Sequence, residues 1–402
     1  MRVEGADFVV VGAGIGGLAA ALLLAGMGAQ VTVLERFDAP GDVDSGLLLH
    51  PNGLAVLVAL GLGDALDGAG VTFQTAAIHD ERGGTIAELR PHDGRHRWDR
   101  LVGLRSSHLH RILSAAIDQP LIGVRLGAQV TAAHPDGSIE LRWRGRTSTI
   151  AADLVVGADG VASTVRAGGA FGTTTRETGA RFIHGLVEGA DLGLDGEHWT
   201  RLGLIGGAAV DDATTYVYAA GTAPQIAAAL ATQDADGLWA AWSAELPVAA
   251  RALSRLLDVD GLRVHEVLRV DCRRMVDGRL VLVGDAAHAM APTLWQGANS
   301  AIVDAAVLAI ELASSVSVPD AVAGYSARRL PAVRRVQDLA DRLVVMAAVR
   351  PRWLRAVRNG TVRSIVTRSG PAAALRRLVM QEDPAALHAA VTGCQTSNPR
   401  SP

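Results

Sequence analysis

The 402-residue sequence contains no lysine, so all 38 of its basic residues are arginines. This absence excludes Walker-type phosphate loops, Schiff-base chemistry and any mechanism that needs a catalytic ammonium group. The chain has two cysteines, Cys272 and Cys394, which are too few for a metal cluster or a disulfide framework. This usage is typical of a reduced, cytoplasmic protein.

The sequence also lacks an excess of charge and a long apolar run. Its 38 basic and 41 acidic residues give a formal net charge of −3, which offers no electrostatic basis for binding nucleic acid or an anionic membrane. No uninterrupted apolar stretch reaches the roughly 18–20 residues of a membrane span. Hydrophobic residues still make up 49% of the chain, enough for a large core. We therefore expect a soluble protein, without a metal site, whose partner is a small molecule.

The clearest motif lies in the N-terminal segment DFVVVGAGIGGLAAALLLAGMGAQVTVLER, residues 7–36. An apolar strand precedes Gly12, Gly14 and Gly17, and an apolar helix, a second strand and Glu35 follow, as in a dinucleotide-binding βαβ unit. The glycines permit a tight turn, close approach of a pyrophosphate and close packing of helix on strand. The helix N-terminus offers N–H groups to the phosphates, and Glu35 accepts hydrogen bonds from ribose hydroxyls. The unit predicts dinucleotide binding without separating NAD from FAD.

Two later segments separate these cofactors. The first is ADLVVGADGVASTVR, residues 152–166, in which a strand leads to Asp159. The second is GRLVLVGDAAHAMAPTLWQGANSAIVDAAVLAIEL, residues 278–312, in which a strand leads to Asp285. With the N-terminal unit, these segments resemble the sequence marks of the p-hydroxybenzoate-hydroxylase-like, single-component FAD monooxygenases. The resemblance extends from residue 7 to about residue 337.

The resemblance implies an α/β fold with a Rossmann-like FAD-binding domain of the GR2 type, a β-sheet substrate domain and C-terminal helices. The expected boundaries are residues 1–70, 99–175 and 276–315 for the FAD-binding domain, 71–98 and 176–275 for the substrate domain, and 316–402 for the C-terminal helical segment. Within the substrate domain, β-like runs are expected at residues 181–188, 200–210 and 214–220, with helices near 226–257. The arginine-rich pattern from residue 319 to about 366 predicts a packing helix with a solvated basic face.

The resemblance also assigns residues to the cofactor. Asp285 holds the ribityl hydroxyls of FAD, and Asp159 helps to seat the flavin and the nicotinamide donor; a helix cap or turn residue is the alternative for each. Arg105 resembles an arginine on the cofactor side, with a solvated helix-start arginine as the alternative. The full set expected to bind FAD is Gly12, Gly14, Gly17, Glu35, Arg36, Arg105, Asp159, Asp285, Pro292, Gly297, Ala298 and Asn299.

Three positions depart from the family pattern, and one of them is Val303, which replaces a common glutamate before Asp304. Trp295 stands where a glycine is common beside the flavin, just before a helix whose positive end faces the pyrimidine edge of the ring by resemblance. The arginine usually found upstream is replaced by a residue near Gly41 or Asp42. Trp295 and the missing arginine both bear on how the nicotinamide donor approaches the flavin.

The activity that the resemblance implies is hydroxylation of an aromatic or polycyclic small molecule. NADPH or NADH reduces FAD, O2 forms a flavin C4a-hydroperoxide, and one oxygen atom passes to the substrate. Epoxidation or Baeyer–Villiger insertion on the same fold, and a flavoprotein dehydrogenase or accessory protein without oxygenase activity, stay open as alternatives. We expect a monomer or homodimer, and composition favours a role in tailoring natural products such as antibiotics.

No catalytic residue is assigned from the sequence. The sheet of the substrate domain covers the flavin in this family, which makes a set of polar and aromatic residues candidates for substrate contact, with ordinary packing as their alternative. These candidates are His184, Arg201, Tyr216, Tyr218 and Trp295. His288 lies near the flavin by resemblance, and a hydrogen-bonded structural histidine is its alternative.

Overall fold

The computed structural model describes most of the chain. The described residues are 3–39, 45–90, 94–189, 192, 194, 196–221, 223–258 and 264–396. Gly41 and Asp42, which stand where the family has an arginine, lie outside the described residues.

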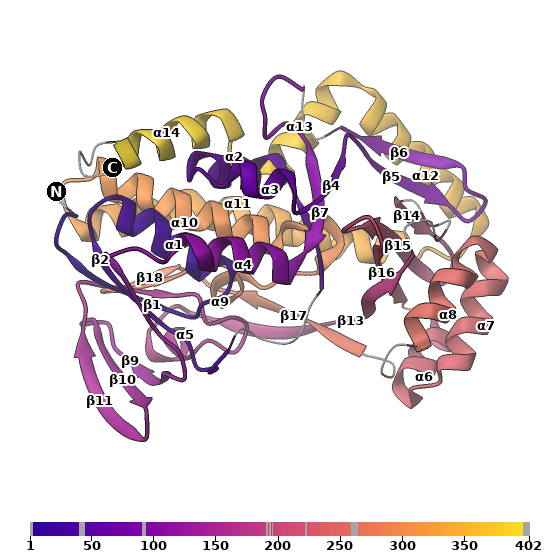
Figure 1. The fold of residues 1–402 in the computed structure, drawn as a ribbon. Coiled ribbons are helices and arrows are strands. Elements are labelled where there is room, and N and C mark those ends of the chain that lie inside the picture. Colours follow the sequence, from indigo (N-terminus) through magenta and orange to yellow (C-terminus); the bar gives the residue numbers. More distant parts are fainter. Residues whose placement is uncertain are drawn as a thin grey trace.

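A six-stranded sheet lies at the centre of one half of the molecule, on the left in Figure 1. Its order is β18-β19-β12-β1-β2-β8, and all pairs are parallel except the β18–β19 hairpin. The strands are β1 (Asp7–Val11), β2 (Gln30–Leu34), β8 (Ile122–Arg125), β12 (Leu154–Gly157), β18 (Val276–Asp277) and β19 (Leu280–Leu282). After Asp7, β1 reads FVVV and is completely buried, as expected for a central strand of a parallel sheet.

Helices and two small sheets surround this sheet. The helices are α1 (Ile15–Gly26), α2 (Pro51–Ala59), α3 (Gly63–Asp67), α4 (Ser106–Ala116) and α5 (Thr164–Gly168). One small sheet has the order β3-β7-β4, from β3 (Gly46–Leu49), β4 (Gly70–Phe73) and β7 (Leu101–Arg105). The other is β11-β10-β9, from β9 (Gln129–Ala133), β10 (Ser138–Trp143) and β11 (Arg146–Ala151).

A seven-stranded sheet dominates the other half and has the order β17-β13-β16-β15-β14-β5-β6. Its strands are β5 (Ala76–Asp80), β6 (Thr85–Leu89), β13 (Thr174–Glu188), β14 (Gly196–Trp199), β15 (Gly203–Ala209), β16 (Thr214–Gly221) and β17 (Val264–Asp271). One face packs on the helical insertion α6 (Pro224–Thr232), α7 (Ala235–Glu245), η1 (Pro247–Ala249) and α8 (Ala250–Asp258). The opposite face, with Leu204, Tyr216 and Tyr218, packs towards the C-terminal helices.

The C-terminal third of the chain joins the two halves. It contains α9 (Asp285–His288), η2 (Pro292–Leu294), α10 (Gln296–Ser314), α11 (Val318–Ala347), α12 (Arg352–Thr367), α13 (Ser369–Met380) and α14 (Pro384–Thr396). Figure 1 shows α14 beside α2 on the cofactor half and α12 beside β5 and β6 on the other half. The chain therefore closes over both sheets.

Helix α10 is long and apolar enough to cross a membrane by length and composition, but 67% of its apolar window is buried inside the protein. It packs against α1 and α11 and carries the buried polar side chains of Gln296, Asn299 and Asp304. These are properties of a core helix.

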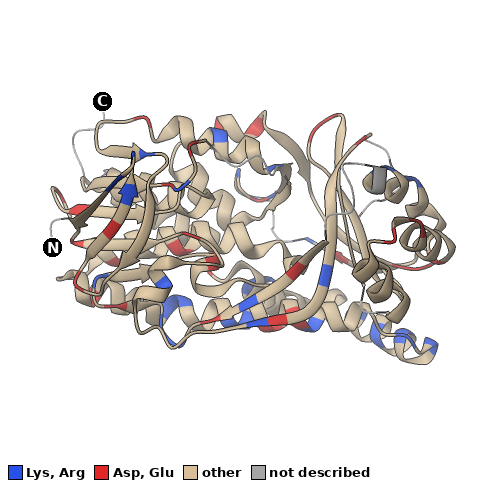
Figure 2. Cartoon of the chain, turned by 90° about the horizontal axis from the view of Figure 1, so that it is seen from below, with Lys and Arg blue, Asp and Glu red and all other residues tan. Residues whose placement is uncertain are grey.

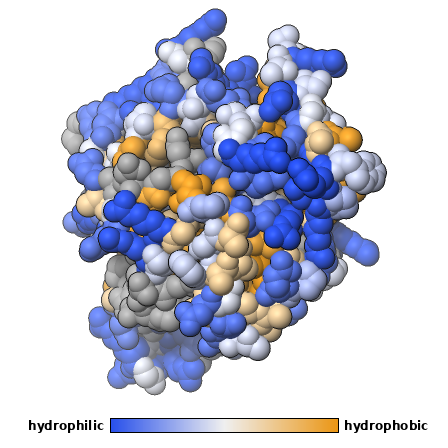
Figure 3. Space-filling view, turned by 90° about the vertical axis from the view of Figure 1, so that its right-hand side faces the viewer, coloured by the Kyte–Doolittle hydropathy of each residue, from blue (hydrophilic) through white to orange (hydrophobic). Residues whose placement is uncertain are grey.

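The surface mixes charges and apolar groups. Figure 2 shows arginines and acidic residues interspersed on the underside, where Arg269 of β17 bonds Asp271, Asp338 and Asp341. At the end that carries α6–α8 and α12, hydrophobic atoms form small patches between hydrophilic ones (Figure 3).

Candidate active site

The glycine-rich turn between β1 and α1 has two tightly packed glycines and one open glycine. Gly12 has φ +103°, and a Cβ atom there would lie 2.4 Å from the Ala158 carbonyl oxygen. A Cβ atom on Gly17 would lie 2.0 Å from the Gly12 carbonyl oxygen. A Cβ atom on Gly14, the N-cap of α1, would meet no protein atom within 4 Å. The free N–H groups at the start of α1 therefore open onto unfilled space.

Glu35, at the end of β2, holds this turn in place. Its carboxylate accepts hydrogen bonds from the N–H groups of Ala13, at 2.8 Å, and Phe37, at 3.0 Å. The side chain is half-buried, and a carboxylate has about four acceptor sites, so Glu35 can accept further hydrogen bonds. The neighbouring Arg36 is exposed, and its guanidinium lies over the Phe37 ring.

Asp285 follows strand β19 and Gly284 at the start of α9. Its side chain is accessible, and no hydrogen bond in the described part of the chain engages its carboxylate. The surrounding protein keeps most bulk water away from this carboxyl group and thereby raises its pKa. The nearby His288 opposes the rise. An accessible acid within the body of the protein is available to bind the hydroxyl groups of a ligand.

Helix α10 brings these elements together. A Cβ atom added to Gly16 of α1, or to Gly284, would lie 2.9 Å from the Cβ atom of Ala301. At the N-terminus of α10, a Cβ atom on Gly297 would meet nothing within 4 Å. A second helix N-terminus therefore opens onto unfilled space, close to the starts of α1 and α9.

A buried ionic network holds Gly284 in place. Asp304 of α10 accepts hydrogen bonds from the Gly284 N–H at 2.9 Å, from His288 Nε2 at 2.6 Å and from Arg329 Nε at 2.7 Å. Burial would raise the pKa of Asp304, but His288, Arg329 and these hydrogen bonds lower it overall. Arg329 is fully buried and also donates to Gln381 Oε1 at 2.6 Å, which ties the turn after α13 to the site.

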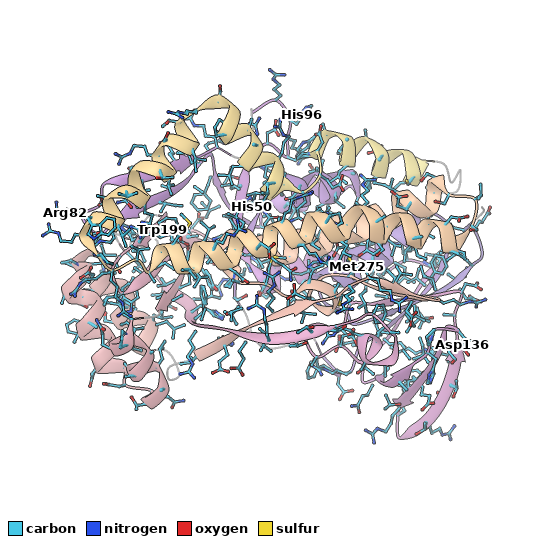
Figure 4. The ribbon with its side chains drawn as sticks, turned by 180° about the vertical axis from the view of Figure 1, so that it is seen from behind. His50, Arg82, His96, Asp136, Trp199 and Met275 are labelled. Carbon is cyan, nitrogen blue, oxygen red and sulfur yellow. The ribbon has the colours of Figure 1, made fainter. Side chains whose placement is uncertain are left out.

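A cavity of about 580 Å³ lies between the seven-stranded sheet and helices α11–α13. Its apolar walls include Leu48, Phe73, Leu101, Leu294, Leu339, Leu343, Val366, Leu375 and Val379. Trp295 forms part of the wall, and its ring meets the rings of Tyr216 and Tyr218 edge-on at 5.4 Å and 5.0 Å between centroids. Figure 4 labels two other lining residues, His50 and Trp199, which lie between α11 and the helices that follow it.

The residues present fit FAD. Two uncapped helix N-termini suit its anionic groups, and accessible acids at Glu35 and Asp285 suit its ribose and ribityl hydroxyls. Sequence comparison agrees, because the family described as FAD binding domain matches residues 6–340. The chain belongs to the p-hydroxybenzoate-hydroxylase-like FAD monooxygenases.

Relatives and solved structures of this hydroxylase family cover most of the chain. An aurachin C monooxygenase/isomerase from Stigmatella aurantiaca is 30% identical over 346 residues, 83% of this chain and 87% of that protein. A 3-amino-4-hydroxybenzoate 2-monooxygenase from Streptomyces cremeus is 32% identical and covers 83% of this chain and 86% of its own length. The tetrameric form of 2-methyl-3-hydroxypyridine-5-carboxylic acid oxygenase superposes with a TM-score of 0.74 at 25% identity, over 92% of this chain and 97% of that one.

Other residues expected to bind FAD in this hydroxylase have protein partners. Both carboxylate oxygens of Asp159 are engaged, by Ser163 Oγ and by the N–H groups of Thr164 and Val165. Asp159 thus bonds the first turn of α5 (Thr164–Gly168), whose N-cap is Ser163. Arg105 Nε lies 2.8 Å from Asp211 Oδ2, so Arg105 ties β7 to the loop between β15 and β16.

Of the expected FAD-binding residues around the start of α10, one has protein partners and the others are at least partly exposed. Asn299 donates to the carbonyl oxygens of Leu48 and Trp295 and accepts from the His50 N–H, a structural role. Pro292 is exposed, and Ala298 is half-buried beside Gly297. At Gly297 and Ala298, the polar groups available to a cofactor are therefore those of the backbone.

The structure brings some of the expected substrate residues to the cavity and leaves others outside. Tyr218 and Trp295 line it, and Tyr216 packs directly behind them. His184 stacks on His265 at 4.5 Å between ring centroids and is not among the lining residues. Arg201 is exposed and ion-paired with Glu245, also outside the lining.

Sequence reasoning missed two buried ionisable residues of the cavity wall and placed three buried arginines at the surface. Glu197 and His50 line the cavity, and neither was a candidate. The prediction of a solvated basic face over residues 319–366 is wrong for Arg329, which is completely buried against Asp304, and for Arg355 and Arg358 of α12, which are also buried. His288 has the structural hydrogen bond considered as its alternative.

Proposed function

We propose that this protein is an NAD(P)H-dependent FAD monooxygenase that hydroxylates an aromatic small molecule inside the 580 Å³ cavity. The observation that carries the proposal is the position of Trp295. This residue is at once the N-cap of α10, a helix expected to face FAD, and part of the cavity wall. The cofactor region and the cavity therefore meet at one residue.

The FAD-binding role rests on a few residues of this chain. The backbone at Gly14 and the start of α1 would receive the pyrophosphate, Glu35 the ribose and Asp285 the ribityl chain. The N–H groups at Gly297 and Ala298 would face the pyrimidine edge of the flavin, where a helix N-terminus stabilises negative charge. When bound and reduced by NAD(P)H, FAD supplies the activation of O2, and one oxygen atom passes to the substrate.

The protein's own contribution is position and exclusion of water. The aromatic side chains of Trp199, Tyr218 and Trp295 present flat apolar surfaces to an aromatic ring. Helices α11–α13 cover the cavity opposite the sheet and limit contact with solvent.

The test is consumption of NADH and NADPH with coupled O2 uptake by the FAD-loaded protein, with and without a panel of phenols, benzoates and polycyclic aromatics. We expect at least one compound to raise the rate about tenfold or more and to yield a hydroxylated product. If FAD stays bound but neither nicotinamide reduces it under any condition, the proposed function fails.

We also propose that the protein is a cytoplasmic monomer or homodimer. The reduced state expected of Cys272 and Cys394 supports this location. Light scattering on the purified holoenzyme gives the oligomeric state directly, and a tetramer would contradict the proposal.

A further inference from the structure

Charged side chains around the cavity are divided between its rim and its interior. Glu88, Arg90 and Arg376 line it but are exposed, and Glu88 lies 3.6 Å from Arg90. Glu197 also lines the cavity, but it is only 9% exposed. Among the described lining residues, Glu197 is therefore the one buried acid, and no arginine accompanies it in the interior.

Strand register explains how an acid comes to lie there. Glu197 of β14 and Tyr218 of β16 both pair with Gly206 of β15, which lies between them. Because Gly206 has no side chain, Tyr218 lies across it and donates its hydroxyl hydrogen to Glu197 Oε2 at 3.1 Å. Trp199 Nε1 donates to Oε1 at 2.5 Å.

The Glu197 carboxylate retains capacity for a ligand. These two hydrogen bonds use about half of its acceptor sites. Burial raises the pKa of Glu197 to about 7, although the hydrogen bonds from Trp199 and Tyr218 oppose the rise. The nearby Arg358 lies over the Trp199 ring but is outside the lining, and it donates to the Met346 and Ala347 carbonyl oxygens.

His50 provides a second polar group. Its side chain lines the cavity, is only 8% exposed and has no hydrogen-bond partner for either ring nitrogen. Burial lowers the pKa of His50 to about 4, so the imidazole is neutral near pH 7. A neutral imidazole offers one donor and one acceptor, and leaving both unsatisfied inside a protein is costly.

We propose that Glu197 and His50 make this cavity select uncharged aromatic substrates that carry an N–H or O–H donor and reject aromatic carboxylates. The inference rests on the proposed function and names its substrate class. A substrate donor bonds to the free acceptor sites of Glu197, and His50 bonds to a second polar atom of the same molecule. A substrate carboxylate placed there meets a buried acid with no buried arginine among the lining residues.

The test compares matched pairs of probes that differ by one carboxylate. These are 2-naphthol against 3-hydroxy-2-naphthoate, and 4-quinolone against 4-hydroxyquinoline-2-carboxylate. Binding to the FAD-loaded protein is measured by calorimetry without NAD(P)H at about pH 8, above the pKa of about 7 of Glu197, so that this carboxyl group is mostly ionised. We expect the uncharged member of each pair to bind at least about tenfold more tightly.

The variant Glu197→Gln removes the charge and keeps the shape. We expect it to reduce the preference about tenfold, mainly through tighter binding of the carboxylates. The control Glu140→Gln, at an exposed position of β10, should retain the wild-type preference. Equal or tighter carboxylate binding by the wild type, or an unchanged preference in Glu197→Gln, would overturn the inference.

The design separates this inference from the proposed function. Binding is measured without turnover, so a clear preference with no hydroxylation by NAD(P)H and O2 would sink the proposed function alone. Hydroxylation without the preference would sink the inference alone. The wild-type comparison needs no variant, so it decides the question even if Glu197→Gln does not fold.

Discussion

The cofactor half and the substrate half of this molecule place their chemistry in different ways. Around the proposed FAD site, the groups open to a ligand include backbone positions, such as the N-termini at Gly14 and Gly297. Around the cavity, the groups open to a ligand are side chains that different strands bring together, such as Glu197 and Tyr218. Local sequence therefore specifies the first region, whereas tertiary structure specifies the second.

The two halves also differ in the partners that they give to a buried acid. Asp304 in the cofactor half has a buried cation, Arg329, as its partner. Glu197 in the substrate half has only two neutral donors, which do not offset burial, so its pKa is raised. Paired charge stabilises a fixed geometry, and an acid with neutral partners remains responsive to a ligand or to pH.

The largest expected effect comes from removing the cation of the cofactor half. Arg329→Leu leaves Asp304 buried without its guanidinium partner, so we expect a loss of about 3–5 kcal/mol in the free energy of unfolding. Urea unfolding of the FAD-free protein measures it. The double variant Arg329→Leu with Asp304→Asn should lose less than the sum of the single variants, and strict additivity would contradict the coupling.

A smaller effect is expected for the acid of the substrate half, and it depends on pH. Burial raises the pKa of Glu197 from its usual 4.5 to about 7, so the folded protein holds this proton more tightly than the unfolded chain. This tighter proton binding adds to the free energy of unfolding. The contribution is fully present below about pH 4.5 and is lost as the pH rises through 7. Relative to Glu197→Gln, the wild type should therefore lose up to about 3 kcal/mol between pH 4.5 and 8.

Unfolding curves for both proteins across this pH range provide the measurement. The Glu140→Gln control should follow the wild type. Parallel curves for the wild type and Glu197→Gln would show that the carboxyl group is not held in its protonated form.

The same contrast explains what could be predicted from sequence. The βαβ unit with Gly12, Gly14, Gly17 and Glu35 was recognisable because a tight turn and close helix packing impose residue types at fixed local spacing. The FAD-binding fold followed from that unit and the two later motifs. Arg329 was missed because its partner, Asp304, is 25 residues away on another helix.

The substrate site was harder because its strands were assigned imperfectly. The sequence predicted one strand over residues 200–210, whereas the structure has β14 (Gly196–Trp199), a turn and then β15 (Gly203–Ala209). Glu197 thus fell outside every predicted strand. Its burial depends on Gly206 of β15 and Tyr218 of β16. The register of these strands cannot be predicted from a local sequence pattern.

Asp285 allows a test of whether the cofactor half trades stability for binding. Asp285→Asn removes a charge that burial disfavours but weakens hydrogen bonds to FAD hydroxyls. We expect FAD affinity to fall about tenfold to a hundredfold, equivalent to roughly 1.4–3 kcal/mol, with unchanged or higher stability of the FAD-free protein. Flavin fluorescence titration and thermal unfolding measure the two quantities, and unchanged affinity would contradict the assigned role.

The smallest effect concerns Trp295, where the two halves meet. Its backbone is left-handed, with φ +56° and ψ +26°, a conformation that costs a non-glycine residue roughly 1–2 kcal/mol. Trp295→Gly removes this strain but also the ring contacts with Tyr216 and Tyr218, which contribute about 0.5–1.5 kcal/mol each. The net change in unfolding free energy is therefore the loss of these contacts and of the burial of the ring, less the relief of strain.

Comparison with Trp295→Ala separates the two contributions. Alanine loses the same ring contacts but keeps a Cβ atom and hence the strain, so Trp295→Ala should be less stable than Trp295→Gly by about 1 kcal/mol. This order reverses the usual advantage of alanine over glycine at a helix, and thermal unfolding of both variants measures it. Equal stability would mean that the backbone relaxes at this position, and the tryptophan would then be retained for its cavity-facing ring alone.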